Sequence, residues 1–191
     1  MRTEWFPLVN EKGETIGKAT RKECHSGSKL LHPVIHLHIF NKDGDLYLQK
    51  RSMNKDIQPG KWDTAVGGHV DLGESVEMAL RREAEEELGL TGFTPERLPY
   101  YVFESDRERE LVFPHRCTYD GEIRPSAETD GGRFWSTTEI HEAMGKGICP
   151  ADTGGSMEPA VCGGITEKAL YRVSAGYSVV RQHGGTGLRG R

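Results

Sequence analysis

Residues 68–90 carry the clearest chemical signal in the chain. Seven carboxylates fall between Asp71 and Glu87. Three of them, Glu83, Glu86 and Glu87, follow the i, i+3, i+4 spacing of a helix and therefore share one face of it. Because like charges at this spacing repel each other, the cluster indicates a bound cation. Carboxylate oxygens are ligands that Mg²⁺ and Mn²⁺ prefer, together with water and substrate phosphate.

A helix is expected to hold this cluster. Glu74 and Ser75 provide an N-terminal start, with carboxylates in the first turn where the helix dipole favours them. An apolar stripe at helical spacing would face the core: Val76, Ala79, Leu80, Ala84 and Leu88. Gly89 stands where a left-handed cap ends a helix. We therefore expect the acidic face to lie opposite the buried face and to be open to a ligand, with Gly67 and Gly68 allowing close backbone approach.

The order of these residues resembles the signature of the Nudix hydrolases. That signature consists of Gly, five residues, Glu, seven residues, Arg-Glu, an aliphatic residue, any residue, Glu-Glu, any residue, Gly and an aliphatic residue. Its places are filled here by Gly68, Glu74, Arg82, Glu83, Ala84, Glu86, Glu87, Gly89 and Leu90. The alternative is a solvated surface helix in which Arg82 pairs with Glu86. That alternative leaves the upstream glycines unexplained.

The resemblance implies a reaction and a metal site. The reaction is hydrolysis of a diphosphate linkage, nucleoside diphosphate-X in form, with Mg²⁺ or Mn²⁺. Glu83 and Glu87 would be the main ligands, with Glu86 on or beside the metal and the Gly68 carbonyl completing the site. Arg82, aided by Glu74, would hold the glutamates in place. The general base stays open among Glu86, Glu108 and Glu110.

Histidines and carboxylates outside this stretch form a second candidate constellation. On an extended strand, His32, His36 and His38 share one face, and the apolar residues between them share the other. Downstream, Glu108 and Glu110 lie on one side of an expected strand. Such donors from separate segments suit zinc or manganese. For any one of these histidines, the alternative is an ordinary solvated strand face.

The second constellation is similar to the metal site of the type I isopentenyl diphosphate isomerases, which share the Nudix fold. Those enzymes hold a metal with three histidines and two glutamates, and the matching positions are His25, His32, His69, Glu108 and Glu110. The similarity runs from about residue 5 to residue 135. It departs at Gly67, where the isomerases carry a cysteine for allylic proton transfer, because glycine can neither donate nor accept a proton. The isomerases also lack the full Arg-Glu…Glu-Glu signature.

Three functional classes therefore stay open. The unbroken signature favours a metal-dependent diphosphate hydrolase. An isopentenyl diphosphate isomerase-like enzyme is second, and a catalytically silent diphosphate-binding module is third. The sequence does not choose among nucleoside triphosphates, sugar nucleotides, dinucleotides and isoprenoid diphosphates. Side chains that could meet a phosphate or stack on a base are Lys50, Arg51, Lys55, Trp62, Tyr101 and Phe103.

Length and composition predict one sizeable domain, and the small-molecule diphosphate substrate is what the resemblance implies. The chain has 191 residues and a formal net charge of −4, without the continuous basic stripe of a nucleic-acid binder. No apolar run reaches the length of a membrane span, and the first residues lack the apolar core of a secretory signal. The cysteines, Cys24, Cys117, Cys149 and Cys162, show no zinc or redox spacing. We therefore expect free thiols and a cytoplasmic protein.

The order of expected elements predicts an α/β (α+β) fold with a mixed sheet flanked by helices, the α/β/α sandwich that the resemblance also implies. An amino-terminal hairpin, 4–9 and 15–20, precedes it, and its free edge leaves a homodimer open. Strands are expected at 34–40, 46–50, 100–104, 111–119 and 132–135, and a helix at 137–144. We expect one domain over residues 1–148 and a mobile Gly-rich tail over residues 149–191.

Overall fold

The computed structural model describes residues 3–54, 59–127, 129–143, 146, 160–162 and 165–166. The helices are α1 (Arg21–Cys24), α2 (Val76–Leu88) and α3 (Thr137–Ala143). The longer strands are β1 (Trp5–Val9), β2 (Thr15–Thr20), β3 (Leu31–Phe40), β4 (Leu46–Arg51), β9 (Arg109–Thr118) and β10 (Thr129–Trp135). The shorter ones are β5 (Trp62–Asp63), β6 (Val66–His69), β7 (Glu96–Arg97), β8 (Tyr101–Glu104), β11 (Ala160–Cys162) and β12 (Ile165–Thr166).

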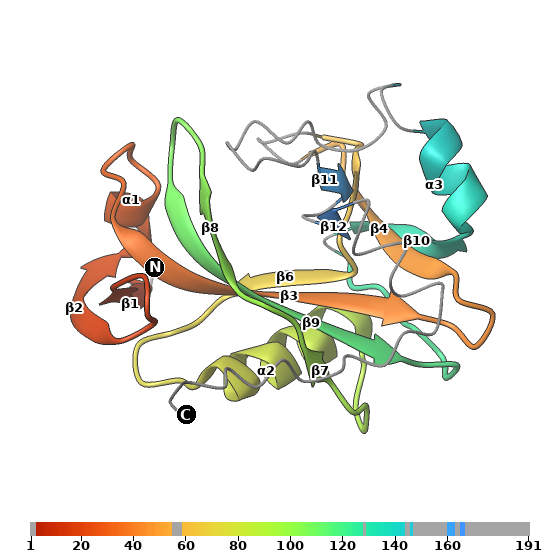
Figure 1. Cartoon of the computed structure of the whole chain (residues 1–191), viewed down its shortest axis with the longest axis horizontal. Coiled ribbons are helices and arrows are strands. Elements are labelled where there is room, and N and C mark those ends of the chain that lie inside the picture. Colours follow the sequence, from red (N-terminus) through yellow and green to blue (C-terminus); the bar gives the residue numbers. More distant parts are fainter. Residues whose placement is uncertain are drawn as a thin grey trace, which may run out of the picture.

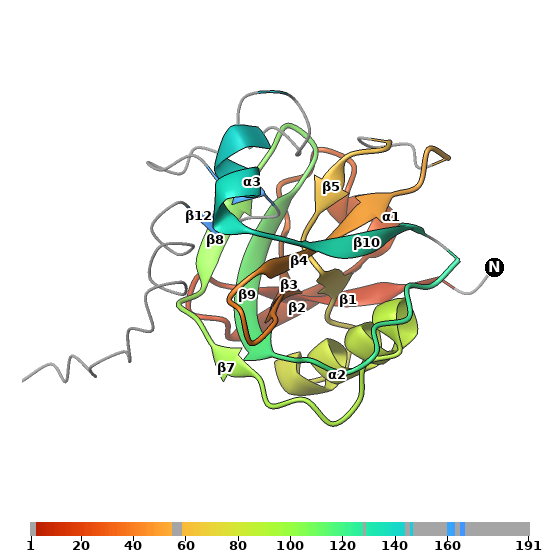
Figure 2. The same ribbon diagram turned by 90° about the vertical axis from the view of Figure 1, so that its right-hand side faces the viewer.

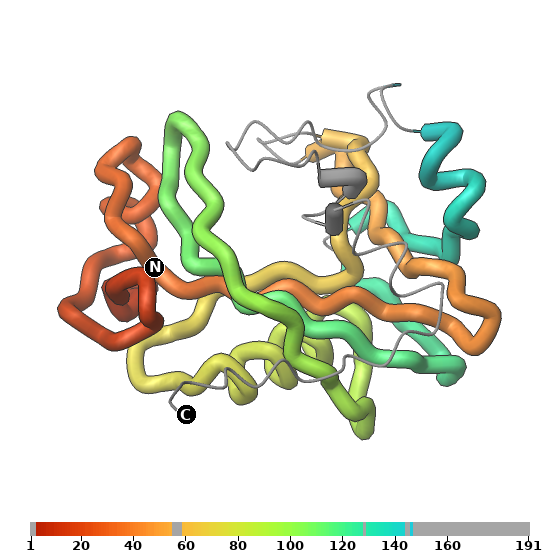
Figure 3. Tube along the Cα trace, in the orientation of Figure 1, coloured from red at the N-terminus to blue at the C-terminus, as the bar shows by residue number. Residues whose placement is uncertain are grey.

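A mixed eight-stranded sheet forms the centre of the molecule. Its main path runs β10-β4-β3-β9-β7, and β5, β6 and β8 pair with β4, β3 and β9. Strands β3 and β9 run parallel over ten residue pairs, from Leu31 opposite Arg109 to Phe40 opposite Thr118. They lie side by side although the chain between them contains a hairpin and a helix (Figures 1 and 3). This parallel pair brings the start of β3 next to the start of β9.

Helix α2 packs on one side of the sheet, and α3 lies on the other side beside β10 (Figures 1 and 2). The buried residues of α2, Ala79, Leu80, Ala84 and Leu88, join the main core cluster with Ile35, Leu37 and Ile39 of β3. The expected apolar stripe of this helix is therefore confirmed, with Val76 partly buried at its start. The mixed sheet and its helices match the predicted α+β class.

The amino-terminal hairpin forms a separate two-stranded sheet of β1 and β2, as predicted. Its buried residues, Phe6 and Ala19, form a second apolar cluster with Cys24. The segment after β2 begins with the short helix α1, which the sequence analysis does not predict, and continues as turns over residues 25–27. Thr20 and Glu23 cap this helix reciprocally through side chain and backbone, which is the capping box that the sequence analysis overlooked.

Most of the predicted tail, residues 149–191, lies outside the described residues, apart from the antiparallel pair β11 and β12. Cys24 and Cys117 are free and buried, as expected. Within the described ranges, none of the helices has the length and hydrophobicity needed to cross a lipid bilayer.

Candidate functional site

Helix α2 begins and ends as the sequence predicts. The Ser75 hydroxyl accepts a hydrogen bond from the Met78 amide at 3.2 Å, and Gly89 closes the helix in the left-handed conformation with φ 63°. These caps fix which residues lie in the same turn. They therefore fix the direction in which the acidic residues of the helix point.

The acidic residues do not lie opposite the buried face of α2, so that expectation was wrong. Glu83 and Glu87 flank the buried stripe and point toward the sheet, and only Glu86 of the three is largely exposed. The helical spacing of the glutamates shows that they share a face of α2, but it does not show which part of the protein packs on that face. A Cβ on Gly68 would overlap the Glu83 carboxyl group, so only glycine allows the strand and this carboxylate to lie so close.

Strands β4 and β6 supply the contacts of Glu87. The Gln49 side-chain amide donates to Glu87 Oε2 at 3.2 Å, and the backbone N–H of Gly67 donates to the same carboxylate. Asp63, opposite Gln49 in the β4–β5 register, acts on Glu87 electrostatically. Gln49 and Asp63 were not predicted, because their position depends on strand register rather than on any local pattern.

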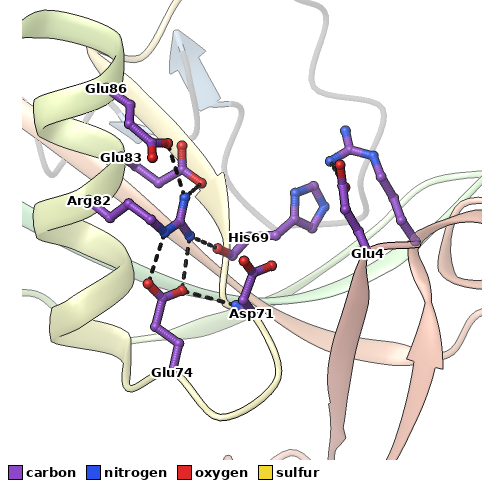
Figure 4. A network of polar contacts seen from close by, with 8 residues as sticks. Glu4, His69, Asp71, Glu74, Arg82, Glu83 and Glu86 are labelled. Carbon is purple, nitrogen blue, oxygen red and sulfur yellow. Dashed lines mark hydrogen bonds and ion pairs between the residues drawn. The ribbon is translucent and has the colours of Figure 1, made fainter. Parts of the chain in front are cut away.

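Arg82 connects the helix to the loop that precedes it (Figure 4). Its guanidinium donates to both oxygens of Glu74 at 2.9 Å, to Glu83 at 2.8 Å and to Glu86 at 3.3 Å. A further bond of 3.1 Å reaches the backbone carbonyl of His69. Arg82 thereby binds Glu83 and ties α2 to the end of β6.

Burial disfavours ionisation of the two carboxyl groups that face the sheet, Glu83 and Glu87. It raises the pKa of Glu87 to about 7, with the negative charge of Glu83 adding to the effect. Burial also raises the pKa of Glu83, against the opposing influence of Arg82. Glu74 differs, since its hydrogen bond from Arg82 lowers its pKa. One arginine therefore does not compensate the whole cluster, and a cation among these oxygens would relieve the repulsion.

Three histidines from separate elements meet at the His69 end of β6. His25 follows α1, His32 lies on β3 and His69 ends β6, and one ligand atom from each lies within 4.8 Å of the others. The Nε2 atoms of His25 and His69 are 3.0 Å apart. The Phe6 ring stacks on His69 with ring centroids 4.4 Å apart and on His32 at 5.7 Å. The amino-terminal hairpin thus forms one wall of this cluster.

Two glutamates lie beside the histidine cluster. Glu108 contacts His25 Nδ1, and Glu110 Oε1 lies 3.9 Å from His32 Nε2. The Leu30 carbonyl holds His32 Nδ1 at 2.9 Å, whereas His32 Nε2 is buried and has no hydrogen-bond partner. Burial raises the pKa of Glu110 to about 8 and lowers the pKa of His32 and His69, so the imidazoles of these two histidines favour the neutral form that binds metals. The orphaned nitrogen and the neutral rings fit a divalent metal.

The other residues considered for substrate contact lie on β4, β5 and β8 or outside the described residues. Arg51 pairs with Asp63 at 3.1 Å, and Lys55 lies outside the described residues. Trp62 packs edge-on against Trp135 with ring centroids 4.9 Å apart. Tyr101 and Phe103 lie on β8, in register with β9.

Several known proteins are similar to this chain. The NUDIX domain family model matches residues 30–148. A relative from Shigella flexneri, the uncharacterized Nudix hydrolase YfcD, is 31% identical over 137 residues, which cover 72% of this chain and 76% of that protein. An isopentenyl-diphosphate Delta-isomerase from Leifsonia xyli is 33% identical over 137 residues, covering 68% and 74% of the two chains.

The crystal structure of DR0079 from Deinococcus radiodurans has a similar fold, with a TM-score of 0.66. At 22% identity it covers 92% of this chain and all of that one, and it supports the fold alone. The family model and the Nudix hydrolase relatives support a hydrolase. Because the family model matches more than half of its residues and encloses the carboxylates of α2, this chain belongs to the Nudix family.

Proposed function

We propose that this protein hydrolyses a diphosphate linkage in a small molecule of the nucleoside diphosphate-X type, with a divalent cation at the carboxylates of α2. The proposal rests mainly on Glu83 and Glu87, which are half-buried against the glycines of β6. Arg82 neutralises only part of their negative charge. Nudix enzymes generally use divalent metals such as Mg²⁺. Carboxylate oxygens and a backbone carbonyl at Gly68 are suitable donors for it.

In this reaction, residues of α2 and β6 would bind the metal or orient its ligands. Glu83 and Glu87 would hold Mg²⁺ or Mn²⁺ with the Gly68 carbonyl, and Arg82 would keep Glu83 in place. Such a cation supplies charge neutralisation to the phosphates and increases the acidity of a water. Since phosphoryl transfer needs little covalent chemistry from the protein, positioning and electrostatics suffice.

Glu86 is the best-placed general base among the three candidates. Its side chain is 61% exposed beside Glu83, where it can pass a proton to solvent. Glu108 and Glu110 instead face the histidine cluster. We assign to that cluster a second divalent metal, zinc or manganese, held by His25, His32, His69, Glu108 and Glu110.

An isomerase of isoprenoid diphosphates is the second candidate, favoured by the assembled histidine cluster. It is opposed by Gly67, which has no group for proton transfer. A Cβ at this position would lie at 3.4 Å from Thr64 and 3.5 Å from His36, which is ordinary contact. Sterics do not demand glycine here, so the difference from the isomerases is chemical.

Glu83→Gln should lower hydrolysis at least about 100-fold, since a metal contributes several kcal/mol to transition-state stabilisation. The measurement is phosphate release over nucleoside di- and triphosphates, sugar nucleotides, dinucleotides and isopentenyl diphosphate, with Mg²⁺, Mn²⁺ or Zn²⁺. Glu85→Gln, an exposed change in the same turn, is the matched control and should keep full activity. Full activity in Glu83→Gln, or a silent wild type with every metal, would contradict the proposal.

Arg82→Ala should weaken Mn²⁺ binding by about 10- to 100-fold, the usual effect of removing a group that orients metal ligands. Arg81→Ala is the matched control, because Arg81 forms an exposed pair with Glu77 and should have little effect. Binding would be followed by electron paramagnetic resonance of free Mn²⁺. Equal affinities in the two variants would show that the Arg82 network does not position a metal.

Metal affinity should depend on pH through Glu87. Its raised pKa of about 7 means that the carboxyl holds a proton at pH 6 and has lost it at pH 8. Because a cation must displace this proton, Mn²⁺ affinity should fall at least about tenfold from pH 8 to pH 6. Titrations at both pH values test this, and Glu87→Gln should show a smaller pH dependence. A wild-type affinity that is the same at both pH values would refute the assignment.

The wild type should not convert isopentenyl to dimethylallyl diphosphate, because Gly67 cannot transfer a proton. Incubation in deuterated water, followed by product analysis and mass spectrometry, tests both conversion and proton exchange. Conversion with deuterium uptake would favour the isomerase candidate over the hydrolase.

A further inference from the structure

His36 belongs to neither candidate metal cluster, yet it lies between them. It stands on β3 directly opposite Gly67 of β6 in the antiparallel register. Alternation along the strand places it on the same face as His32 and His38, opposite the face that packs on α2. The backbone of Gly67 donates to Glu87, and Gly68 and His69, which follow it, adjoin Glu83 and the histidine cluster respectively. His36 therefore adjoins the strand that links the two clusters.

The hydrogen bonding of His36 differs from that of the other buried histidines. The Nδ1 atoms of His32 and His115 are held by backbone carbonyls, and Nδ1 of His38 lies 3.2 Å from the Thr64 hydroxyl. Nδ1 of His36 is shielded from solvent and has no partner. Within the described residues, no hydrogen bond forms at its Nε2 either. A polar side chain without partners at such a position needs an explanation.

The ring presents its Nε2 edge to the space beside Gly67. A Cβ at Gly67 would lie 3.5 Å from Cδ2 and 3.8 Å from Nε2 of His36. The side chain is partly exposed although Nδ1 is covered, so the open part of the ring is the edge that carries Nε2. Glycine at position 67 leaves this edge uncovered, whereas a longer side chain there would cover it.

Burial also determines where the ring proton resides. It lowers the pKa of His36, with Asp63 opposing the effect, so the imidazole is neutral and carries one N–H. A buried N–H without a partner costs more than an unpaired acceptor. The proton therefore belongs on Nε2, and His36 presents a donor beside Gly67.

We propose that His36 is a substrate-binding residue whose Nε2–H donates a hydrogen bond to a phosphate oxygen of the diphosphate. The inference deepens the proposed function and rests on it for the identity of the ligand. A diphosphate held by a cation at the histidine cluster, on the same face of the sheet as His36, would extend along β6 past Gly67. A neutral donor there can bind an anionic oxygen without repelling a bound cation. A protonated imidazole would repel that cation.

The test uses three substitutions that separate the two ring nitrogens. Glutamine places an amide near the position of Nε2, asparagine places one near Nδ1, and phenylalanine keeps a ring without either donor. The probe is methylenediphosphonate with Mg²⁺, a diphosphate analogue that cannot be hydrolysed at its bridge. Its affinity for the full chain would be measured by calorimetry.

We expect His36→Gln to bind the probe within about threefold of the wild type, since it keeps the donor. His36→Asn and His36→Phe should bind about 10- to 100-fold more weakly, the usual effect of losing a hydrogen bond to a charged group. His38→Gln is the matched control on the same strand face, and it should lower thermal stability without changing probe affinity. Unchanged affinity in His36→Phe, or no probe binding by the wild type, would overturn the proposal.

A second measurement does not depend on the folding of any variant. In wild-type protein with ¹⁵N-labelled histidine, the imidazole spectrum should show His36 as a neutral ring protonated at Nε2. That signal should shift when Mg²⁺ and the probe are added together. A signal that does not respond to saturating probe would overturn the proposal.

The two proposals can fail separately. If the wild type hydrolyses a diphosphate and His36→Phe keeps the wild-type KM and kcat, only the role of His36 is overturned. If the probe binds through His36 but no diphosphate is hydrolysed, the hydrolase assignment is overturned and the binding role stands.

Discussion

Helix α2 can lie close to strand β6 only because Gly68 has no side chain, since a Cβ there would overlap the carboxyl group of Glu83. This close approach places Glu83 and Glu87 between helix and sheet instead of on an open surface. Carboxylates in such a place lose solvation, which raises the pKa of both. The glycine thus allows the close approach that desolvates these carboxylates and leaves them in need of a positive charge.

Arg82 supplies only part of that charge. Its guanidinium is divided among Glu74, Glu83 and Glu86 and a carbonyl of the preceding loop, so it orders the loop as well as the helix. Glu87 lies beyond its reach and relies on the neutral donors Gln49 and Gly67. A metal at this site would therefore complete an incomplete electrostatic arrangement. Binding of that metal would couple to folding through the same carboxylates.

Strand β6 joins the two candidate metal sites because neighbouring residues on a strand face opposite ways. Gly68 faces α2, while Gly67 and His69 face the side that carries the histidine cluster. The parallel pairing of β3 with β9 then sets Glu110 beside His32 on that same side. Short-range alternation and a long-range strand pair together bring two candidate metal sites to opposite faces of one strand.

The sequence predicted those features that depend on local interactions. The caps at Ser75 and Gly89 and the apolar stripe of α2 follow from residues within a few positions of one another, and the structure confirms them. The side on which the carboxylates lie could not be predicted, because periodicity gives an angle around the helix and not the surface that it meets. Gln49, Asp63 and the orientation of His36 depend on strand register, which is decided by pairings across the sheet.

The histidine cluster shows a different limit. Its five members are spread over 86 positions, from His25 to Glu110, with no spacing that would group them. Similarity to the isomerases identified them, and the structure brings them together through α1, β3, β6 and β9. Position 67 carries a glycine, which cannot transfer a proton, although a Cβ there would make only ordinary contacts. With these ligands and no acid at position 67, the site we propose would hold a diphosphate without isomerising it, and the carboxylates of α2 would then determine which reaction the bound diphosphate undergoes.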